Sequence, residues 1–151
     1  MGFTGEELSE IYRRMRTIRS FEEKLHELVS AGKIGGFMHL YAGQEAIAVG
    51  VCAQLKQTDL VGSTHRGHGH CVAKGVDVKA MMAELFGRST GTNRGKGGSM
   101  HIADVDKGML GANGIVGGGI PLVTGAALSA QVLGRDDVAV GFFGDGATNQ
   151  G

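Results

Sequence analysis

The feature that most constrains this chain is an apolar run that ends in one acidic residue between two glycines. Residues 138–143 carry no charge, and Gly144, Asp145 and Gly146 follow them. An unbroken apolar run of this length is typical of a strand that is buried on both faces, as in a parallel sheet. Because ligands of open α/β sheets collect beyond the carboxyl ends of the strands, Asp145 stands where a ligand site is expected.

A helix is predicted immediately before this strand. Pro121 suits the first turn of a helix, residues 122–133 continue it, and Gly134 ends it. Helix, short turn and buried strand make half of an α/β unit, and the sequence stops before the next helix. The predicted fold class is therefore α/β, the N-terminal part of a parallel sheet flanked by helices, truncated after the Gly-Asp-Gly strand.

The other periodic segments predict further helices and one more strand. Thr4 and Glu7 have the spacing of a capping box, and apolar residues then recur at intervals of three and four up to Ser30. The remaining expectations are a helix at 43–55, a short strand at 59–63, a loop at 64–70, a helix from Asp77 to about Phe86, and an irregular stretch at 88–119. We expect two parts, an amphipathic helix in 1–35 and an α/β part in 36–151.

Composition excludes several classes of function and leaves one anomaly. The 15 basic and 15 acidic residues cancel, which gives no sign of a nucleic-acid or membrane-surface role. Only two cysteines are present, and no apolar stretch has the length of a membrane span, so we expect a cytoplasmic protein. The anomaly is 28 glycines, six of them in 108–119. Ordering glycine is costly, and such clusters indicate backbone that lies close to a ligand or to other backbone.

Two interpretations of Asp145 follow from the residues around it. A lone carboxylate at a strand end suits a divalent cation that also binds phosphate, because Mg²⁺ prefers one or two carboxylates plus phosphate oxygens. The backbone N–H groups of Gly146, Ala147 and Thr148 would then complement the phosphate charge. Alternatively, Asp145 caps the next helix and binds no ligand.

The histidines also allow more than one interpretation. His65, His68 and His70 precede Cys71, and imidazole with thiolate is a ligand set of zinc. Histidines in glycine-rich loops, which here include His39 and His101, equally suit a polar cleft in which imidazoles transfer protons. Each could also serve only as a structural hydrogen-bonding group.

Five motifs in order give the chain a family resemblance. They are HLYAGQEA at 39–46, THRGHGH at 64–70, GKGGSMH at 95–101, ANGIVGGGIPL at 112–122 and GDGATNQG at 144–151. Over residues 6–151 the chain resembles the alpha subunit of the thiamine-diphosphate-dependent first component of 2-oxo acid dehydrogenase complexes. STHRGHGH and HIADVDKGMLGANGIVGGG are most similar to the acetoin dehydrogenase branch, and the pyruvate dehydrogenase alpha subunit is next.

The resemblance implies a set of cofactor contacts. It implies that Asp145 binds the Mg²⁺ of thiamine diphosphate and that backbone of Gly146 and Ala147 contacts the diphosphate. The other positions that match are Arg66 and His65 as a diphosphate-binding pair (His65 replaces a frequent tyrosine), Gly114 and Val116 as backbone beside the aminopyrimidine, and His39 and His101 as active-site histidines.

The resemblance also implies an activity and partners. Acetoin would be cleaved to acetaldehyde and a two-carbon unit, which passes to a lipoyl-bearing acyltransferase, the second component. The alternatives are oxidative decarboxylation of pyruvate and a non-catalytic assembly subunit. The expected assembly is an α2β2 heterotetramer with a beta subunit. Because the family's metal-binding asparagine pair would follow Gly151, residues 1–151 alone are expected to bind thiamine diphosphate negligibly.

Overall fold

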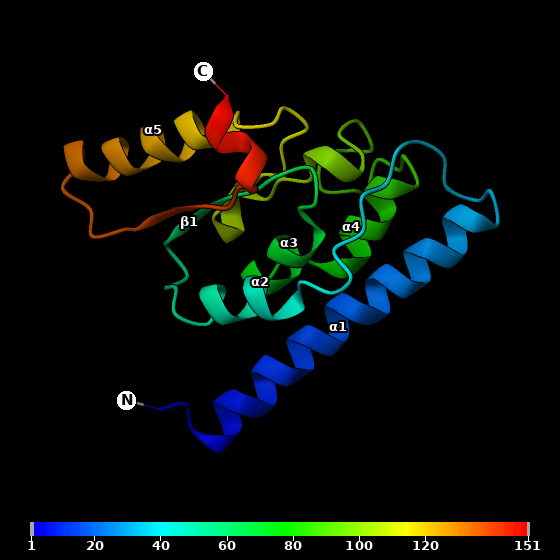
Figure 1. Ribbon diagram of the computed structural model, residues 1–151, viewed down its shortest axis with the longest axis horizontal. Coiled ribbons are helices and arrows are strands. Elements are labelled where there is room, and N and C mark those ends of the chain that lie inside the picture. The colour runs from blue at the N-terminus through cyan, green and yellow to red at the C-terminus, as the bar shows by residue number, and fades with distance from the viewer. Residues whose placement is uncertain (1, 151) are drawn as a thin grey trace.

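A computed structural model describes residues 2–150 as helices on both faces of a three-stranded parallel sheet (Figure 1). The strands are β1 (Leu60–Gly62), β2 (Met109–Gly111) and β3 (Ala139–Gly141), in the order β2-β1-β3, and β1 runs parallel to both neighbours. Helix α5 (Gly119–Val132) covers one face. Helices α2 (Glu45–Cys52) and α3 (His68–Lys74) lie on the other, with α1 (Gly5–Ser30) outside them. The predicted α/β class is confirmed.

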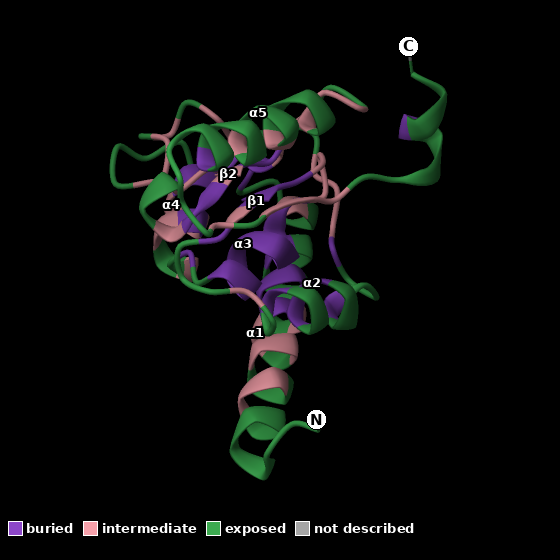
Figure 2. Cartoon of the chain, turned by 90° about the vertical axis from the view of Figure 1, so that its left-hand side faces the viewer, coloured by how far each residue is buried: buried purple, intermediate pink, exposed green. Residues whose placement is uncertain are grey.

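Helix α1 forms for the local reasons that its sequence indicates. The Thr4 hydroxyl accepts from Glu7 N–H at 3.2 Å, and the Glu7 carboxylate accepts from Thr4 N–H at 2.7 Å, which completes the capping box. The helix ends at Ser30, and Gly32 follows with φ of +67°. Its N-terminal half projects from the rest of the chain and is largely exposed (Figure 2).

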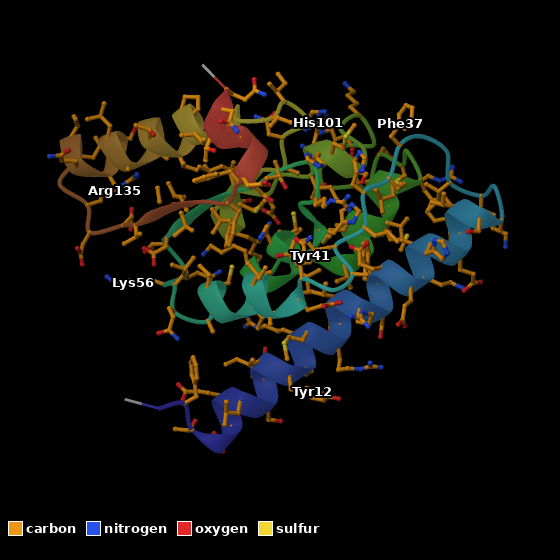
Figure 3. All side chains as sticks on the ribbon, viewed as in Figure 1. Tyr12, Phe37, Tyr41, Lys56, His101 and Arg135 are labelled. Carbon is orange, nitrogen blue, oxygen red and sulfur yellow. The ribbon has the colours of Figure 1, made fainter. Side chains whose placement is uncertain are left out.

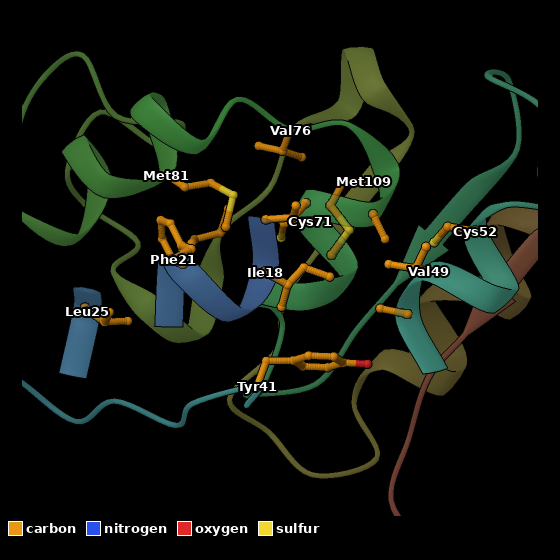
Figure 4. Close-up of a cluster of buried hydrophobic side chains, with 14 of the residues drawn as sticks. Ile18, Phe21, Leu25, Tyr41, Val49, Cys52, Cys71, Val76, Met81 and Met109 are labelled. Carbon is orange, nitrogen blue, oxygen red and sulfur yellow. The ribbon is translucent and has the colours of Figure 1, made fainter. Parts of the chain in front are cut away.

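The core lies where the inner face of α1 meets α2, α3 and the sheet (Figure 4). Ile18, Phe21 and Leu25 bring the apolar stripe of α1 into the same buried cluster as Val61 of β1 and Met109 of β2. Helix propensity alone does not make a helix stable, and this packing supplies most of the missing stability. The division of the chain at residue 35 stays a prediction.

Glycines in two strands allow α5 to lie directly on the sheet. A Cβ atom placed on Gly62 would lie 2.5 Å from Val123 Cγ1, and one on Gly141 would lie 2.7 Å from Val123 Cγ2. Such approaches are closer than van der Waals contact, so a side chain at either position would push the helix away. Part of the high glycine content therefore serves the packing of helix on sheet.

The structure differs from the expectations at four places. The strand at 138–143 was expected to be buried on both faces, but β3 is half-buried, because within residues 2–150 it is an edge strand with α5 on one face. The loop expected at 64–70 turns into α3, and the irregular stretch contains β2. Helix α5 begins at Gly119, two residues before Pro121. For β2, pairing with β1 overrides the local preference of the segment.

The remaining elements are short. Helix α4 (Val78–Leu85) is capped by Asp77, whose carboxylate accepts from Lys79 N–H at 3.0 Å, as expected. Three 3₁₀ turns complete the described structure, η1 (Ser99–His101), η2 (Val105–Lys107) and η3 (Asp145–Asn149). Across residues 2–150, no helix has the length and apolar character that crossing a bilayer requires.

Candidate functional site

Two adjoining cavities open beyond the carboxyl ends of β1 and β3. The smaller, of about 210 Å³, lies between residues 63–65, the glycine-rich segment 113–120 and residues 142–147. The larger, of about 360 Å³, extends from residues 64–66 toward Tyr41 and Gln44. Both are lined by Thr64, His65 and the segment 142–145. The strand ends thus form the kind of crevice in which α/β sheets bind ligands.

Asp145 lines both cavities and keeps its carboxylate available. It is the first residue of η3, it is exposed, and within residues 2–150 its side chain accepts no hydrogen bond. The residue at the N-cap position of η3 is Gly144, so the helix-cap interpretation of Asp145 does not describe this geometry. A single free carboxylate at an open crevice matches the donor set of a phosphate-bound Mg²⁺, for which most ligands come from phosphate and water.

Some polar backbone groups beside Asp145 already take part in hydrogen bonds within the protein. Ala147 N–H donates to the Gly144 carbonyl at 3.0 Å inside the 3₁₀ turn, and the Thr148 hydroxyl donates to the Asp145 carbonyl at 2.6 Å. Gly146 and Ala147 both line the smaller cavity. Their contact with a diphosphate stays a prediction, and for Ala147 it requires the turn to open.

His65 is paired with His39 at the boundary of the two cavities. The two imidazole rings meet edge to face, with centroids 4.9 Å apart and planes 78° apart. Burial lowers the pKa of His65 below its usual value, and the neighbouring His39 and Arg66 lower it further. His65 is therefore neutral at pH 7 and can accept a hydrogen bond in the cavity.

Arg66 lines the larger cavity and is held by backbone on one side. Its Nη1 donates to the Leu40 carbonyl at 2.8 Å, and its backbone N–H donates to the Thr64 hydroxyl at 3.1 Å. A guanidinium has five N–H donors, so most remain for an anion. No carboxylate pairs with it among residues 2–150, which leaves its charge available to a ligand such as a phosphate.

His101 and Gly114 form a second pair at the rim of the smaller cavity. A Cβ atom placed on Gly114 would lie 3.3 Å from His101 Cε1, so the imidazole packs directly on this glycine. Neither residue lines either of these two cavities, although Asn113 and Ile115 on both sides of Gly114 line the smaller one. His101 is exposed and stands apart from Tyr41, which lies at the floor of the larger cavity (Figure 3).

The structure thus gathers most, but not all, of the predicted site residues. His65, Val116, Asp145, Gly146 and Ala147 line the smaller cavity, Arg66 lines the larger one, and His39 contacts His65. His101 and Gly114 remain outside the lining. Their proposed roles depend on a ligand that extends beyond the cavity.

His68 and His70 do not form the zinc site that their spacing suggested. His70 is buried between the Tyr41 hydroxyl, 3.0 Å from Nε2, and Ser63 Oγ, 2.6 Å from Nδ1, and burial lowers its pKa to about 3. The two ring nitrogens of His68 are likewise occupied, and Cys71 is fully buried. Within residues 2–150, no group of three or more His, Cys, Asp or Glu side chains is placed to hold a metal ion.

Sequence reasoning missed the carboxylate that shapes the GKGGSMH segment. Buried Glu84 accepts four backbone N–H bonds, from Asn93, Gly95, Gly97 and Gly98, at 2.7 to 3.1 Å. Burial tends to raise the pKa of Glu84, but these four bonds together hold it below its usual value. No pattern in the sequence could have identified Glu84, because its partners lie nine to fourteen residues along the chain in an irregular loop.

Comparison with known proteins gives consistent matches. Residues 13–151 match the family model of the dehydrogenase E1 component. The alpha subunit of acetoin:2,6-dichlorophenolindophenol oxidoreductase from Bacillus subtilis is 60% identical over 151 residues, which are 100% of this chain and 45% of that protein. The same subunit from Cupriavidus necator is 59% identical over 146 residues, 97% of this chain and 44% of that protein.

Alpha subunits of pyruvate dehydrogenase are more distant. The pyruvate dehydrogenase E1 component subunit alpha of Rhizobium meliloti is 48% identical over 149 residues, 99% of this chain and 43% of that protein. The chain therefore spans less than half the length of the relatives that it matches.

Proposed function

Because the chain belongs to the dehydrogenase E1 component family, we propose that it is part of the alpha subunit of a thiamine-diphosphate-dependent acetoin dehydrogenase. Membership of the family confirms the resemblance on which the five motifs agree. The observation that carries the acetoin proposal is the identity to acetoin oxidoreductase alpha subunits, 60% against 48% for a pyruvate dehydrogenase alpha subunit.

The two cavities support a cofactor with a diphosphate and an apolar ring system. Asp145 would bind Mg²⁺, and Arg66 and His65 would contact the diphosphate. Val116 lines the smaller cavity, and its backbone and that of Gly114, which lies outside the lining, would contact an aminopyrimidine. This assignment uses the carboxylate of Asp145, the imidazole of His65 and the guanidinium of Arg66, which pairs with no carboxylate in the part of the chain that the structure describes.

The protein's own contribution to the reaction is charge and exclusion of water. When bound, thiamine diphosphate supplies a nucleophilic carbon for the substrate carbonyl and a ring that accepts the electron pair of the bond that breaks. Phe142 and Ile120 give the cavity apolar walls, which strengthen every electrostatic contact inside it. His39 and His101 would orient the substrate or the diphosphate from the rim.

Two further candidates keep the same fold. With pyruvate as substrate, the chain would belong to a pyruvate dehydrogenase alpha subunit, a candidate favoured by the second group of relatives. A non-catalytic assembly subunit would bind the beta subunit without turnover. For the leading proposal the partners are a beta subunit in an α2β2 heterotetramer and a lipoyl-bearing acyltransferase, and the location is the cytoplasm.

The test measures dye reduction by the full chain together with its beta subunit. We expect Mg²⁺-dependent and thiamine-diphosphate-dependent reduction of 2,6-dichlorophenolindophenol with acetoin, and slower reduction with pyruvate. The reverse preference would replace the acetoin proposal with the pyruvate one. A stable complex with the beta subunit that turns over neither substrate would favour the assembly role.

An Asp145→Asn variant tests the metal assignment directly. Even outer-shell partners of a metal ligand cost roughly 10- to 100-fold in affinity when they are lost, so removal of a ligand charge is expected to weaken Mg²⁺-dependent cofactor binding by at least about 100-fold. The matched control is Asp136→Asn, which removes a carboxylate that is fully exposed beside Lys56. Titration calorimetry of the full alpha chain assembled with its beta subunit measures the affinity, and equal cofactor affinity in the two variants would refute the role of Asp145.

A further inference from the structure

We propose that a buried chain of three side chains, Glu22–His68–Ser99, positions the segment that carries His101. Glu22 belongs to α1, His68 to α3 and Ser99 to η1, so the chain joins the outermost helix to the rim of the smaller cavity. The functional meaning of this placement rests on the proposed function, in which His101 is an active-site histidine. The three residues are positioning residues and do not contact a ligand.

The hydrogen bonds between these three side chains are short and are shielded from water. Glu22 Oε1 lies 2.8 Å from His68 Nδ1, and Ser99 Oγ lies 2.9 Å from His68 Nε2. Glu22 and His68 are fully buried, and Ser99 is 4% exposed. One ring nitrogen of His68 thus faces the Glu22 carboxylate, and the other faces the Ser99 hydroxyl. The imidazole thereby fixes the direction of the Ser99 side chain.

Glu22 and His68 have few hydrogen-bond partners, so each depends on the other members of this buried series of three side chains. Glu22 Oε2 is buried and has no hydrogen-bond partner within residues 2–150, so the carboxylate is compensated only through His68. The rings of Phe21 and His68 meet in a T-shaped contact, with centroids 5.7 Å apart, which restricts rotation of the imidazole. A buried polar group that loses its partner carries the full cost of desolvation. Neither Glu22 nor Ser99 can therefore move independently of His68.

Ser99 transmits this constraint to His101 across a single 3₁₀ turn. His101 N–H donates to the Gly98 carbonyl at 3.2 Å, and the imidazole packs on Gly114. On the other side of the turn, Glu84 binds the N–H groups of Gly97 and Gly98 at 2.7 and 3.1 Å. Glu84 therefore fixes the path of the backbone up to residue 98, and the Ser99–His68 bond fixes the turn that follows.

A Ser99→Ala variant of the full chain, without cofactor, tests the proposal. We expect the His101 Cε1–H resonance to move in spectra of histidine-labelled protein, and the amides of residues 98–103 to exchange about tenfold faster, as loss of one buried hydrogen bond implies. The matched control is Ser129→Ala on α5, where the hydroxyl donates only to the Gly125 carbonyl at 2.9 Å. That variant should leave both signals as in the wild type.

Glu22→Gln provides a second, conservative variant. Its amide oxygen can still accept from Nδ1–H while the charge is gone, so the His101 resonance should shift in the same direction by a smaller amount. In the assembled enzyme, both variants should lower kcat with acetoin and leave KM nearly unchanged, because His101 is misplaced while the cavity is intact.

The outcomes separate this proposal from the proposed function. Wild-type His101 signals and amide exchange in both Ser99→Ala and Glu22→Gln would overturn the positioning role, even if the wild-type enzyme is active. Altered signals in these variants, with wild-type signals in Ser129→Ala, support it even if no acetoin turnover is found. In that case only the proposed function would fail.

Discussion

The imidazole of His70 stacks on the ring of Phe142, with centroids 3.8 Å apart and planes 22° from parallel. This contact joins α3 to the residue that precedes the Phe143-Gly144-Asp145 edge of both cavities. His70 also forms hydrogen bonds with Tyr41 and Ser63, so the floor of the larger cavity is continuous with the core. The stack thus links the core to the segment that carries Asp145.

Removal of the stacked ring should therefore destabilise the chain more than removal of its neighbour. Phe142→Ala is expected to lower the free energy of unfolding by about 2 kcal/mol, through lost burial and lost stacking. Phe143 is 52% exposed, and Phe143→Ala should cost no more than about 0.5 kcal/mol. Urea unfolding of the two variants measures the difference, and equal losses would contradict the supporting role of the stack.

Burial of His70 predicts a specific dependence of stability on pH. Its pKa in the folded chain is about 3, far below the usual 6.5, so below pH 6.5 the unfolded state takes up a proton that the folded state does not. The contribution is complete above pH 6.5 and is lost as the pH falls, by about 1.4 kcal/mol per pH unit.

The measurement compares the wild type with His70→Gln, which cannot titrate. Between pH 6.5 and 5.5, the free energy of unfolding of the wild type should fall by about 1 kcal/mol more than that of the variant, because the unfolded state is already half protonated at pH 6.5. Parallel pH profiles for the two proteins would show that His70 titrates normally in the folded chain.

Glu84 should be essential for the shape of the GKGGSMH segment. Glu84→Gln replaces one acceptor oxygen by an NH₂ group that faces backbone N–H donors, so we expect a loss of about 3 kcal/mol in the free energy of unfolding. The amides of Asn93, Gly95, Gly97 and Gly98 should exchange faster. The control is Glu23→Gln on the exposed side of α1, and similar effects of the two substitutions would refute this role of Glu84.

The contact of α5 with the sheet predicts a compensating pair of substitutions. Gly141→Ala alone should cost about 1 to 3 kcal/mol, because its Cβ atom would overlap Val123. In a Val123→Ala background, the same substitution should be nearly neutral. A double-mutant cycle by thermal unfolding measures the coupling, and additive effects would mean that the helix does not approach the strand this closely.

Local signals were sufficient for the ends of several elements. The capping box of Thr4 and Glu7 and the Asp77 cap of α4 are each determined by residues within a few positions, and both are confirmed. The strand before Gly144 also forms, as β3 (Ala139–Gly141), although it is shorter and less buried than expected. The family could also be identified, because five short motifs in a fixed order need no tertiary information. The carboxylate of Asp145 was expected at the strand end and lies there.

The histidines of α3 show what local sequence patterns do not predict. Their spacing favoured a loop and suggested a zinc site, whereas packing of Gly69 against Tyr41 holds the segment in a helix and directs His68 and His70 into separate buried networks. The partners of His68 are Glu22 and Ser99, which lie 46 and 31 residues away from it in the sequence. A composition or spacing rule contains no information about such pairs.

The sequence by itself determined the helix caps, the α/β class, the family and the place of the lone carboxylate, because each depends on residues that are neighbours in the chain. Only the tertiary structure decided which imidazoles face a cavity and which are enclosed in the core, and that Glu84 shapes the segment before His101. These features arise when buried polar groups find partners from distant elements, and the cost of leaving any of them unpaired selects a single arrangement.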